Sequence, residues 1–209
     1  MISYAQDKED IILYQLLKGY KGHDLKLSDI RYIDVGANDP ERLSVTKLFY
    51  DMGAHGINIE PLEDVCAKLA VERPYDINLN YGLGSERGRA KLYVNGMGSS
   101  FYYIGAEFET KEVEILTLED IRQAYKLKTI HFCKIDVEGF EKEVLLGVKD
   151  WSKFRPWIFC MESTIAGTYI PNYQEWEYIL LENGYELCYE HGINRFYKDK
   201  DIQLGEVTL

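Results

Sequence analysis

The chain consists mainly of short apolar runs that alternate with amphipathic stretches. A run of β-branched and aromatic residues that ends at a glycine, a proline or an acid indicates a strand, whereas apolar residues at every third or fourth position indicate a helix. The alternation predicts an α/β protein with a mostly parallel sheet and helices on both of its faces. The predicted strands cover residues 31–35, 55–60, 75–81, 90–94, 112–118, 131–136 and 157–162, and the predicted helices cover residues 7–18, 40–52, 62–72, 117–125, 139–147 and 176–183.

The end of the chain adds a hairpin to this core. Residues 185–189 and 194–197 are short strand-like runs separated by a turn, and they predict an antiparallel β-hairpin at the sheet edge. The chain has 209 residues, of which 46% are hydrophobic, and this fits one domain with a sizeable core. We therefore expect a single domain over residues 1–209, with an N-terminal helix and connection over residues 1–29 and the core over residues 30–209.

Polar residues cluster on the first turn of the N-terminal helix, namely Gln6, Asp7, Glu9 and Asp10. Asp7 is placed to cap the helix. A solvated helix end is the favoured interpretation of this cluster. A lid that reaches into a crevice is the alternative.

The stretch Arg31–Pro40 is the centre of the pattern. Its apolar run ends in Asp34 and Gly36 and predicts a buried strand, a tight turn and a helix start. Ligands of open α/β sheets bind beyond the carboxyl ends of the strands, and glycine lets the backbone approach them closely. We therefore expect Asp34, Gly36, Ala37 and Asn38 to face a cofactor. An ordinary turn that needs a glycine explains the motif alone equally well.

The turn favours one cofactor over another. A dinucleotide fingerprint needs three glycines, whereas this turn has only Gly36, and its acidic surroundings suit a ligand with an amine and a sulfonium. S-adenosylmethionine is such a ligand. Glu60, at the end of the second strand and followed by Pro61, is placed to accept hydrogen bonds from the ribose hydroxyls. Capping of the helix over residues 62–72 is the weaker alternative.

The third strand ends at Tyr81 and Gly82, which we expect beside the adenine. Beyond it, the segment Gly96–Tyr103 is a loop of glycines, hydroxyls and aromatic residues. Such loops often form substrate walls, and we expect Ser99 and Ser100 to contact the substrate. A plain surface loop is the alternative.

A second dense motif spans His131–Glu141. Period-two alternation places Lys134, Asp136 and Glu138 on one face at the end of a central strand. Ionisable groups there are costly unless they pair or act in catalysis. For Lys134 and Asp136, an ion pair and a catalytic role are equally supported by the sequence. The next strand also ends in an acid, Glu162.

Charge and composition narrow the function classes. Lysine and arginine total 24 against 35 acidic residues, and a net charge of −11 makes nucleic acid an unfavourable partner. No apolar run is long enough for a membrane span, and the start shows no signal-peptide pattern, so we expect a cytoplasmic protein. The four cysteines form no CxxC pair, and we expect them to be reduced.

Together these segments resemble the FkbM-type family of S-adenosylmethionine-dependent methyltransferases, which has the seven-stranded, Rossmann-like class I methyltransferase fold. The matching segments are Ser3–Asp10, Ile33–Asn38, Ile57–Pro61, Ser99–Ser100, Lys134–Glu141 and Gly192–Tyr197. The first and last of these look like members linked to bacterial surface-polysaccharide clusters. The resemblance implies methyl transfer to a hydroxyl, on a sugar of a capsule or O-antigen or on its precursor.

The resemblance implies roles in methyl transfer for the acids at the strand ends. Asp136 is expected nearest the methionine portion and the methyl group, with Glu138 and His191 positioned to bind or deprotonate the acceptor hydroxyl. His131 and Glu162 are further candidates for acceptor binding. Asp136, Glu138 and Glu162 could also supply oxygen ligands to Mg²⁺, but they have no dedicated metal signature, so a mechanism without a metal is favoured.

Other functions share parts of this pattern. A methyltransferase of small metabolites or lipids has the same motifs. An NAD-dependent oxidoreductase shares the fold, although the second and third glycines are missing, and a non-catalytic binding domain would keep the fold without the acids. The sequence leaves open the acceptor, its carrier and the oligomeric state, including a homodimer.

Overall fold

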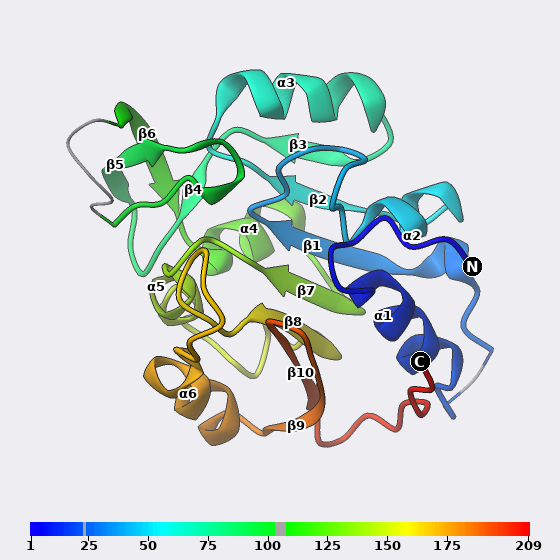
Figure 1. The fold of residues 1–209 in the computed structure, drawn as a ribbon. Coiled ribbons are helices and arrows are strands. Elements are labelled where there is room, and N and C mark those ends of the chain that lie inside the picture. The colour runs from blue at the N-terminus through cyan, green and yellow to red at the C-terminus, as the bar shows by residue number, and fades with distance from the viewer. Residues whose placement is uncertain (23, 103–107) are drawn as a thin grey trace.

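The computed structural model describes residues 1–22, 24–102 and 108–209. Its main sheet has seven strands in the order β3-β2-β1-β7-β8-β10-β9 (Figure 1). The five strands from β3 to β8 are parallel, whereas β10 is antiparallel to both β8 and β9. The strands are β1 (Arg31–Val35), β2 (His55–Ile59), β3 (Ile77–Leu79), β7 (Phe132–Ile135), β8 (Ile158–Glu162), β9 (Tyr185–His191) and β10 (Asn194–Asp199). The mostly parallel sheet and the C-terminal hairpin are therefore confirmed.

Helices cover both faces of this sheet (Figure 1). The helices are α1 (Glu9–Lys18), α2 (Lys47–Asp51), α3 (Glu63–Glu72), α4 (Leu118–Tyr125), α5 (Glu141–Leu146) and α6 (Glu177–Glu182). Side chains of α1 and α2 pack on one face, and side chains of α4, α5 and α6 pack on the other. None of these helices in the described part of the chain is long and apolar enough to cross a membrane.

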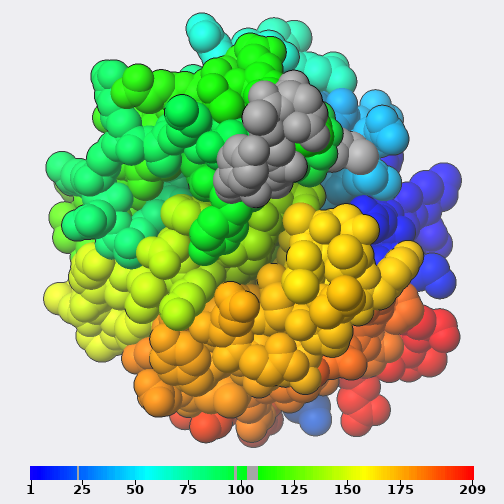
Figure 2. All heavy atoms as spheres, turned by 60° about the vertical axis from the view of Figure 1, so that its left-hand side comes forward, coloured from blue at the N-terminus to red at the C-terminus, as the bar shows by residue number. Residues whose placement is uncertain are grey.

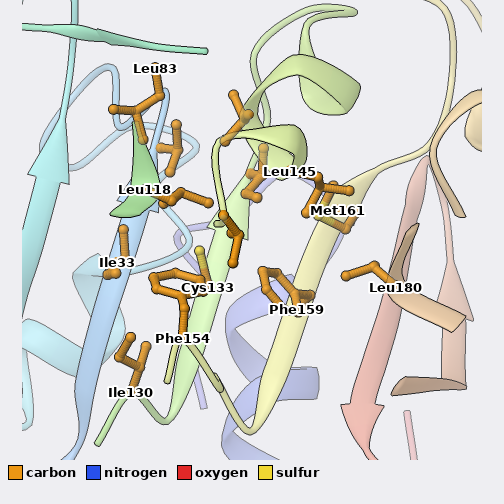
Figure 3. Packing of buried hydrophobic residues seen from close by; sticks show 14 of the residues in the cluster. Ile33, Leu83, Leu118, Ile130, Cys133, Leu145, Phe154, Phe159, Met161 and Leu180 are labelled. Atoms are coloured by element: carbon orange, nitrogen blue, oxygen red, sulfur yellow. The ribbon is translucent and has the colours of Figure 1, made fainter. Parts of the chain in front are cut away.

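Alternation along the central strands divides the core into two layers. Ile33 on β1, Cys133 on β7 and Phe159 on β8 belong to the layer under α4, α5 and α6 (Figure 3). Tyr32 and Phe132 point to the opposite layer, under α1 and α2. Because β1 and β7 are buried on both faces, they contain almost no exposed positions.

The predicted helix over residues 40–52 is shorter in the structure. Only α2 is helical, because the buried guanidinium of Arg73 binds the segment before it. This group donates to the carbonyl of Pro40 and to the hydroxyls of Ser44 and Thr46. Leu43 has a φ of 56°, which also breaks the helical path.

Three further strands form a separate small sheet, which the sequence analysis did not predict as a unit. They are β4 (Gly82–Leu83), β5 (Gly88–Val94) and β6 (Glu109–Leu116), in the order β4-β6-β5. Figure 2 shows this sheet (green) above the segment that follows β8 (yellow to orange). The small sheet has its own apolar cluster, which includes Leu92 and Val113. Of the predicted loop Gly96–Tyr103, the last residue lies outside the described residues.

The interpretation of the N-terminal turn as a solvated helix end is wrong for two of its four polar residues. Glu9 and Asp10 are buried, and the N-cap position is taken by Lys8 rather than Asp7. Asp10 accepts hydrogen bonds from the Ser3 hydroxyl and the Tyr4 amide, so it anchors the segment before α1. The four cysteines are free thiols, as predicted.

Candidate functional site

A cavity of about 430 Å³ lies at the carboxyl ends of β1, β2 and β7. This is the position at which open α/β sheets bind ligands. The small sheet, the N-terminal turn and the start of β10 complete its walls. The structure brings together most of the predicted site residues in these walls, namely Gly36, Ala37, Asn38, Glu60, Pro61, Tyr81, Gly82, Ser99, Asp136 and Glu138.

Gly36 forms the floor where the turns after β1 and β7 meet. Its φ of 74° lies in the left-handed region, and a Cβ atom there would overlap the carbonyl oxygen of Asp136. The amides of Gly36 and Ala37 both donate to the carbonyl of Ile59, which ties the turn to β2. A side chain at position 36 would therefore disturb both the backbone and the neighbouring strand end.

Glu60 connects two turns at the β2 side of the cavity. Its carboxylate accepts hydrogen bonds of 2.9 Å from the amides of Asn38 and Leu62. Burial raises the pKa of this carboxyl, although the two amides act against that shift. Each oxygen retains a second lone pair for a ligand hydroxyl. Glu60 thus serves the start of α3, which was the weaker interpretation, and it also lines the cavity.

Asp34 does not line the cavity, contrary to the expectation that it faces a cofactor. It is 1% exposed, accepts a 2.7 Å hydrogen bond from the Thr46 hydroxyl and lies 3.2 Å from Lys134 Nζ. The reason is strand alternation, because Asp34 projects with Tyr32 toward the face covered by α1 and α2, while Val35 projects to the other face. Asp34 therefore supports Lys134 from behind the cavity wall.

Lys134 joins the ends of β1 and β7. Its ammonium donates a 2.6 Å hydrogen bond to the carbonyl of Gly36 and lies 3.6 Å from an oxygen of Asp136. Burial opposes its charge, but the carboxylates of Asp34 and Asp136 outweigh burial and raise the pKa of Lys134. Lys134 thus stays charged and fixes the strand ends, which favours the ion-pair interpretation for this residue.

Three acids converge at the ends of β7 and β8. Asp136, Glu138 and Glu162 each offer an oxygen, and these oxygens lie within 4.8 Å of one another. Burial and the charges of Asp136 and Glu138 raise the pKa of Glu162 to about 10, so Glu162 carries a proton at neutral pH. Burial and the charges of Asp136 and Glu141 raise the pKa of Glu138 to about 7.

Asp136, Glu138 and Glu162 are also the three predicted metal ligands. Their spacing would suit a cation such as Mg²⁺, which prefers carboxylate oxygens. A proton shared among the three carboxyls would relieve the same repulsion, so the arrangement fits either a proton or a cation.

Glu138 is also held in an unusual backbone conformation. Its φ is 54°, which non-glycine residues adopt mainly where the surrounding structure enforces it. The buried Ser100 hydroxyl donates a 2.8 Å hydrogen bond to its carbonyl. Ser100 thus does not line the cavity but positions Glu138. Ser99 lines the cavity, and its hydroxyl closes the turn by accepting from the Asn95 amide and donating to the Gly96 carbonyl.

Neither of the predicted histidines lines the cavity. His131 precedes β7 and therefore lies at the opposite edge of the sheet, where its Nδ1 accepts a hydrogen bond from the Arg31 amide and its ring packs on Trp157. Its predicted contact with the acceptor has no support from this placement. His191 ends β9 and is half-buried in the hairpin.

The cavity also contains residues from both ends of the chain. Gln6 and Glu9 line it, as the alternative interpretation of the N-terminal turn expected, and Ile193 and Asn194, which the sequence analysis did not assign to the site, line it from the start of β10. Glu9 is 3% exposed, and one of its oxygens accepts a 2.5 Å hydrogen bond from the Asn194 amide group. A signal was available, because both segments carry the family resemblance.

Comparisons with known proteins identify the family of this chain. Residues 34–187, more than half of the chain, match the model of a family described as the methyltransferase FkbM domain. No curated protein sequence matches the chain. The crystal structure of methyltransferase FkbM from Methylobacillus flagellatus KT is similar in fold, with a TM-score of 0.55 and 18% sequence identity. The match covers 82% of this chain but only 44% of that chain.

Proposed function

The chain belongs to the FkbM methyltransferase family, and from that premise we propose that it transfers a methyl group from S-adenosylmethionine to a hydroxyl, on a sugar of a bacterial surface polysaccharide or its precursor. One observation carries the proposal: Gly36, Glu60 and Asp136 line one cavity at the carboxyl ends of three neighbouring parallel strands.

The residues present fit this cofactor. Glu60 would hold the ribose, Tyr81 and Gly82 would lie beside the adenine, and Gly36 would leave room for the methionine portion. The cavity wall carries the acids Glu60 and Asp136, which suit a ligand with a sulfonium and an ammonium. Glu60 would suit the ribose of either cofactor, whereas the turn after β1 lacks the second and third glycines that a pyrophosphate needs, which argues against the oxidoreductase alternative.

Methyl transfer to a hydroxyl needs the acceptor oxygen aligned with the methyl group, and it needs a group that takes the hydroxyl proton. When bound, S-adenosylmethionine would supply a methyl group on a sulfonium, and in-line transfer of that group to the acceptor oxygen would leave a neutral thioether. Glu138 takes the proton of the acceptor hydroxyl, because a carboxylate whose pKa lies near 7 is poised to act as a general base at neutral pH. Protonated Glu162 and charged Lys134 hold Asp136 beside it.

The sugar acceptor rests on the family resemblance and on the polar groups of the wall. Carboxylate and amide side chains such as Glu138, Asn194 and Gln6 can exchange hydrogen bonds with several hydroxyls. The test is the chemical analysis of glycans from cells that lack the protein. Loss of a methyl group from one sugar supports the proposal, whereas unchanged glycan methylation would favour a small-metabolite or lipid acceptor.

Replacement of Glu60 by Ala should weaken the binding of S-adenosylhomocysteine by at least about tenfold, because hydrogen bonds to a charged acceptor contribute on the order of 1.5–3 kcal/mol. Isothermal titration measures the loss. Asp39→Ala is the matched control, since Asp39 accepts from the Glu41 and Arg42 amides in the turn after β1 but does not line the cavity. Equal affinities of the parent and Glu60→Ala would place Glu60 outside the binding site.

A further inference from the structure

Glu9 is a buried carboxyl in the wall of the cavity. One oxygen accepts from the Asn194 side-chain amide, and the other accepts a 2.8 Å hydrogen bond from the Asp7 amide. The charged groups that act on it are the acids Asp7 and Asp136, and burial together with these charges raises its pKa to about 7. Among the described residues, Glu9 has no ion-pair partner.

Such a group is costly for the folded chain. A buried carboxylate is stable only if it is paired, hydrogen-bonded or protonated, and neighbouring acids increase the cost. The amides that bond Glu9 stabilise its charge only in part, because burial and the neighbouring acids still leave its pKa raised. The wall of the cavity therefore has a site for a cationic group of a ligand.

The sheet order gives the position of this site. Glu60 lies at the end of β2, and Glu9 interacts with Asp136 after β7 and with Asn194 on β10. Gly36, after β1, lies between the two ends because β1 separates β2 from β7. Neighbouring strands are about 4.8 Å apart, so the β2 and β7 ends are separated by about 10 Å. Glu9 lies beyond this span, toward β10, where its carboxylate is bonded to Asn194, so a ligand whose ribose meets Glu60 would reach Glu9 with a flexible chain at its other end.

We propose that Glu9 binds the α-ammonium group of the methionine portion of the cofactor, with Asn194 holding the carboxyl in position. The inference rests on the proposed function, which supplies the ligand. It assigns a binding role to the N-terminal turn, which precedes the matched family segment of residues 34–187. The alternative use of Glu9, contact with the acceptor, is an outcome of the test.

The first arm of the test uses the unmodified chain and three nucleosides in isothermal titration. S-adenosylhomocysteine has both the ammonium and the carboxylate, its decarboxylated analogue keeps only the ammonium, and 5′-methylthioadenosine has neither. The decarboxylated analogue should bind about tenfold or more tightly than 5′-methylthioadenosine. Equal affinities of these two would overturn the inference. Failure of all three nucleosides to bind would overturn the proposed cofactor, and the inference with it.

The second arm compares variants with the same ligands. Glu9→Gln should lose about tenfold in affinity for S-adenosylhomocysteine and keep its affinity for 5′-methylthioadenosine, whereas Glu60→Ala should weaken both. Glu41→Gln, which removes an exposed carboxyl outside the cavity, is the matched control and should change neither. If Glu9→Gln binds S-adenosylhomocysteine as the parent does, Glu9 faces the acceptor and the inference is wrong. If Glu9→Gln does not fold, the analogue series decides.

Discussion

Replacement of Glu138 by Gln should lower the rate of methyl transfer by about 10²–10⁴, the usual contribution of general acid–base catalysis, with little change in cofactor affinity. Gln keeps the size of the side chain but cannot take a proton from the acceptor hydroxyl. Transfer is measured with radiolabelled S-adenosylmethionine and whichever glycan acceptor supports turnover by the parent chain. Isothermal titration with S-adenosylhomocysteine gives the affinity.

The pH dependence of kcat/KM distinguishes a catalytic role of Glu138 from a purely structural one. Because the pKa of Glu138 is raised to about 7, the active, deprotonated fraction grows as the pH rises through 7, and kcat/KM of the parent should rise with it. This rise should disappear in Glu138→Gln but persist in Glu143→Gln, a control one turn into α5 that does not line the cavity. A lowered melting temperature with near-normal turnover in Glu138→Gln would contradict the assignment. Inactivation of the parent by EDTA, with recovery on adding Mg²⁺, would instead assign the three acids to a metal.

Replacement of Gly36 by Ala should both destabilise the chain and weaken cofactor binding. The left-handed φ of 74° costs alanine about 1–2 kcal/mol, and the added Cβ overlaps the carbonyl oxygen of Asp136. The overlap must push apart the ends of β1 and β7, which Lys134 holds together. We expect a melting temperature lower by several degrees and a loss of affinity for S-adenosylhomocysteine of more than tenfold.

Gly167→Ala is the matched control for this change. Gly167 also lines the cavity with a φ of 69°, but a Cβ there meets no atom within 4 Å. The Gly167→Ala variant therefore has the same unfavourable backbone conformation but no steric overlap. Similar losses of cofactor affinity in the two variants would show that the contact between Gly36 and Asp136 is not what shapes the binding floor.

Much of the fold followed from the sequence because the strand ends carry strong local signals. The run from Tyr32 to Gly36 and the run before Gly139 each end where backbone conformation demands a glycine, with φ values of 74° and 100°. These signals placed Gly36, Glu60 and Asp136 at one edge of the sheet. The prediction that Asp34 faces the cofactor was wrong because β1 is buried on both faces. The pattern of its residues therefore does not show which side chains at its carboxyl end point toward the cavity.

The other differences depend on contacts between distant residues. Arg73 shortens the predicted helix over residues 40–52 by binding backbone and hydroxyl oxygens ahead of it. Glu9 and Asn194 meet from opposite ends of the chain, and Glu9 is buried where they meet. Local periodicity carries no information about such pairs, so the turn was interpreted as solvated.

Parallel isothermal titrations of the unmodified chain with S-adenosylhomocysteine and with NAD distinguish the two cofactors that this fold could bind. The cavity at Gly36, Glu60 and Asp136 should bind S-adenosylhomocysteine saturably, with one molecule per chain, and should give no response to NAD. Tight binding of NAD with no response to S-adenosylhomocysteine would contradict the assignment of this cavity to S-adenosylmethionine.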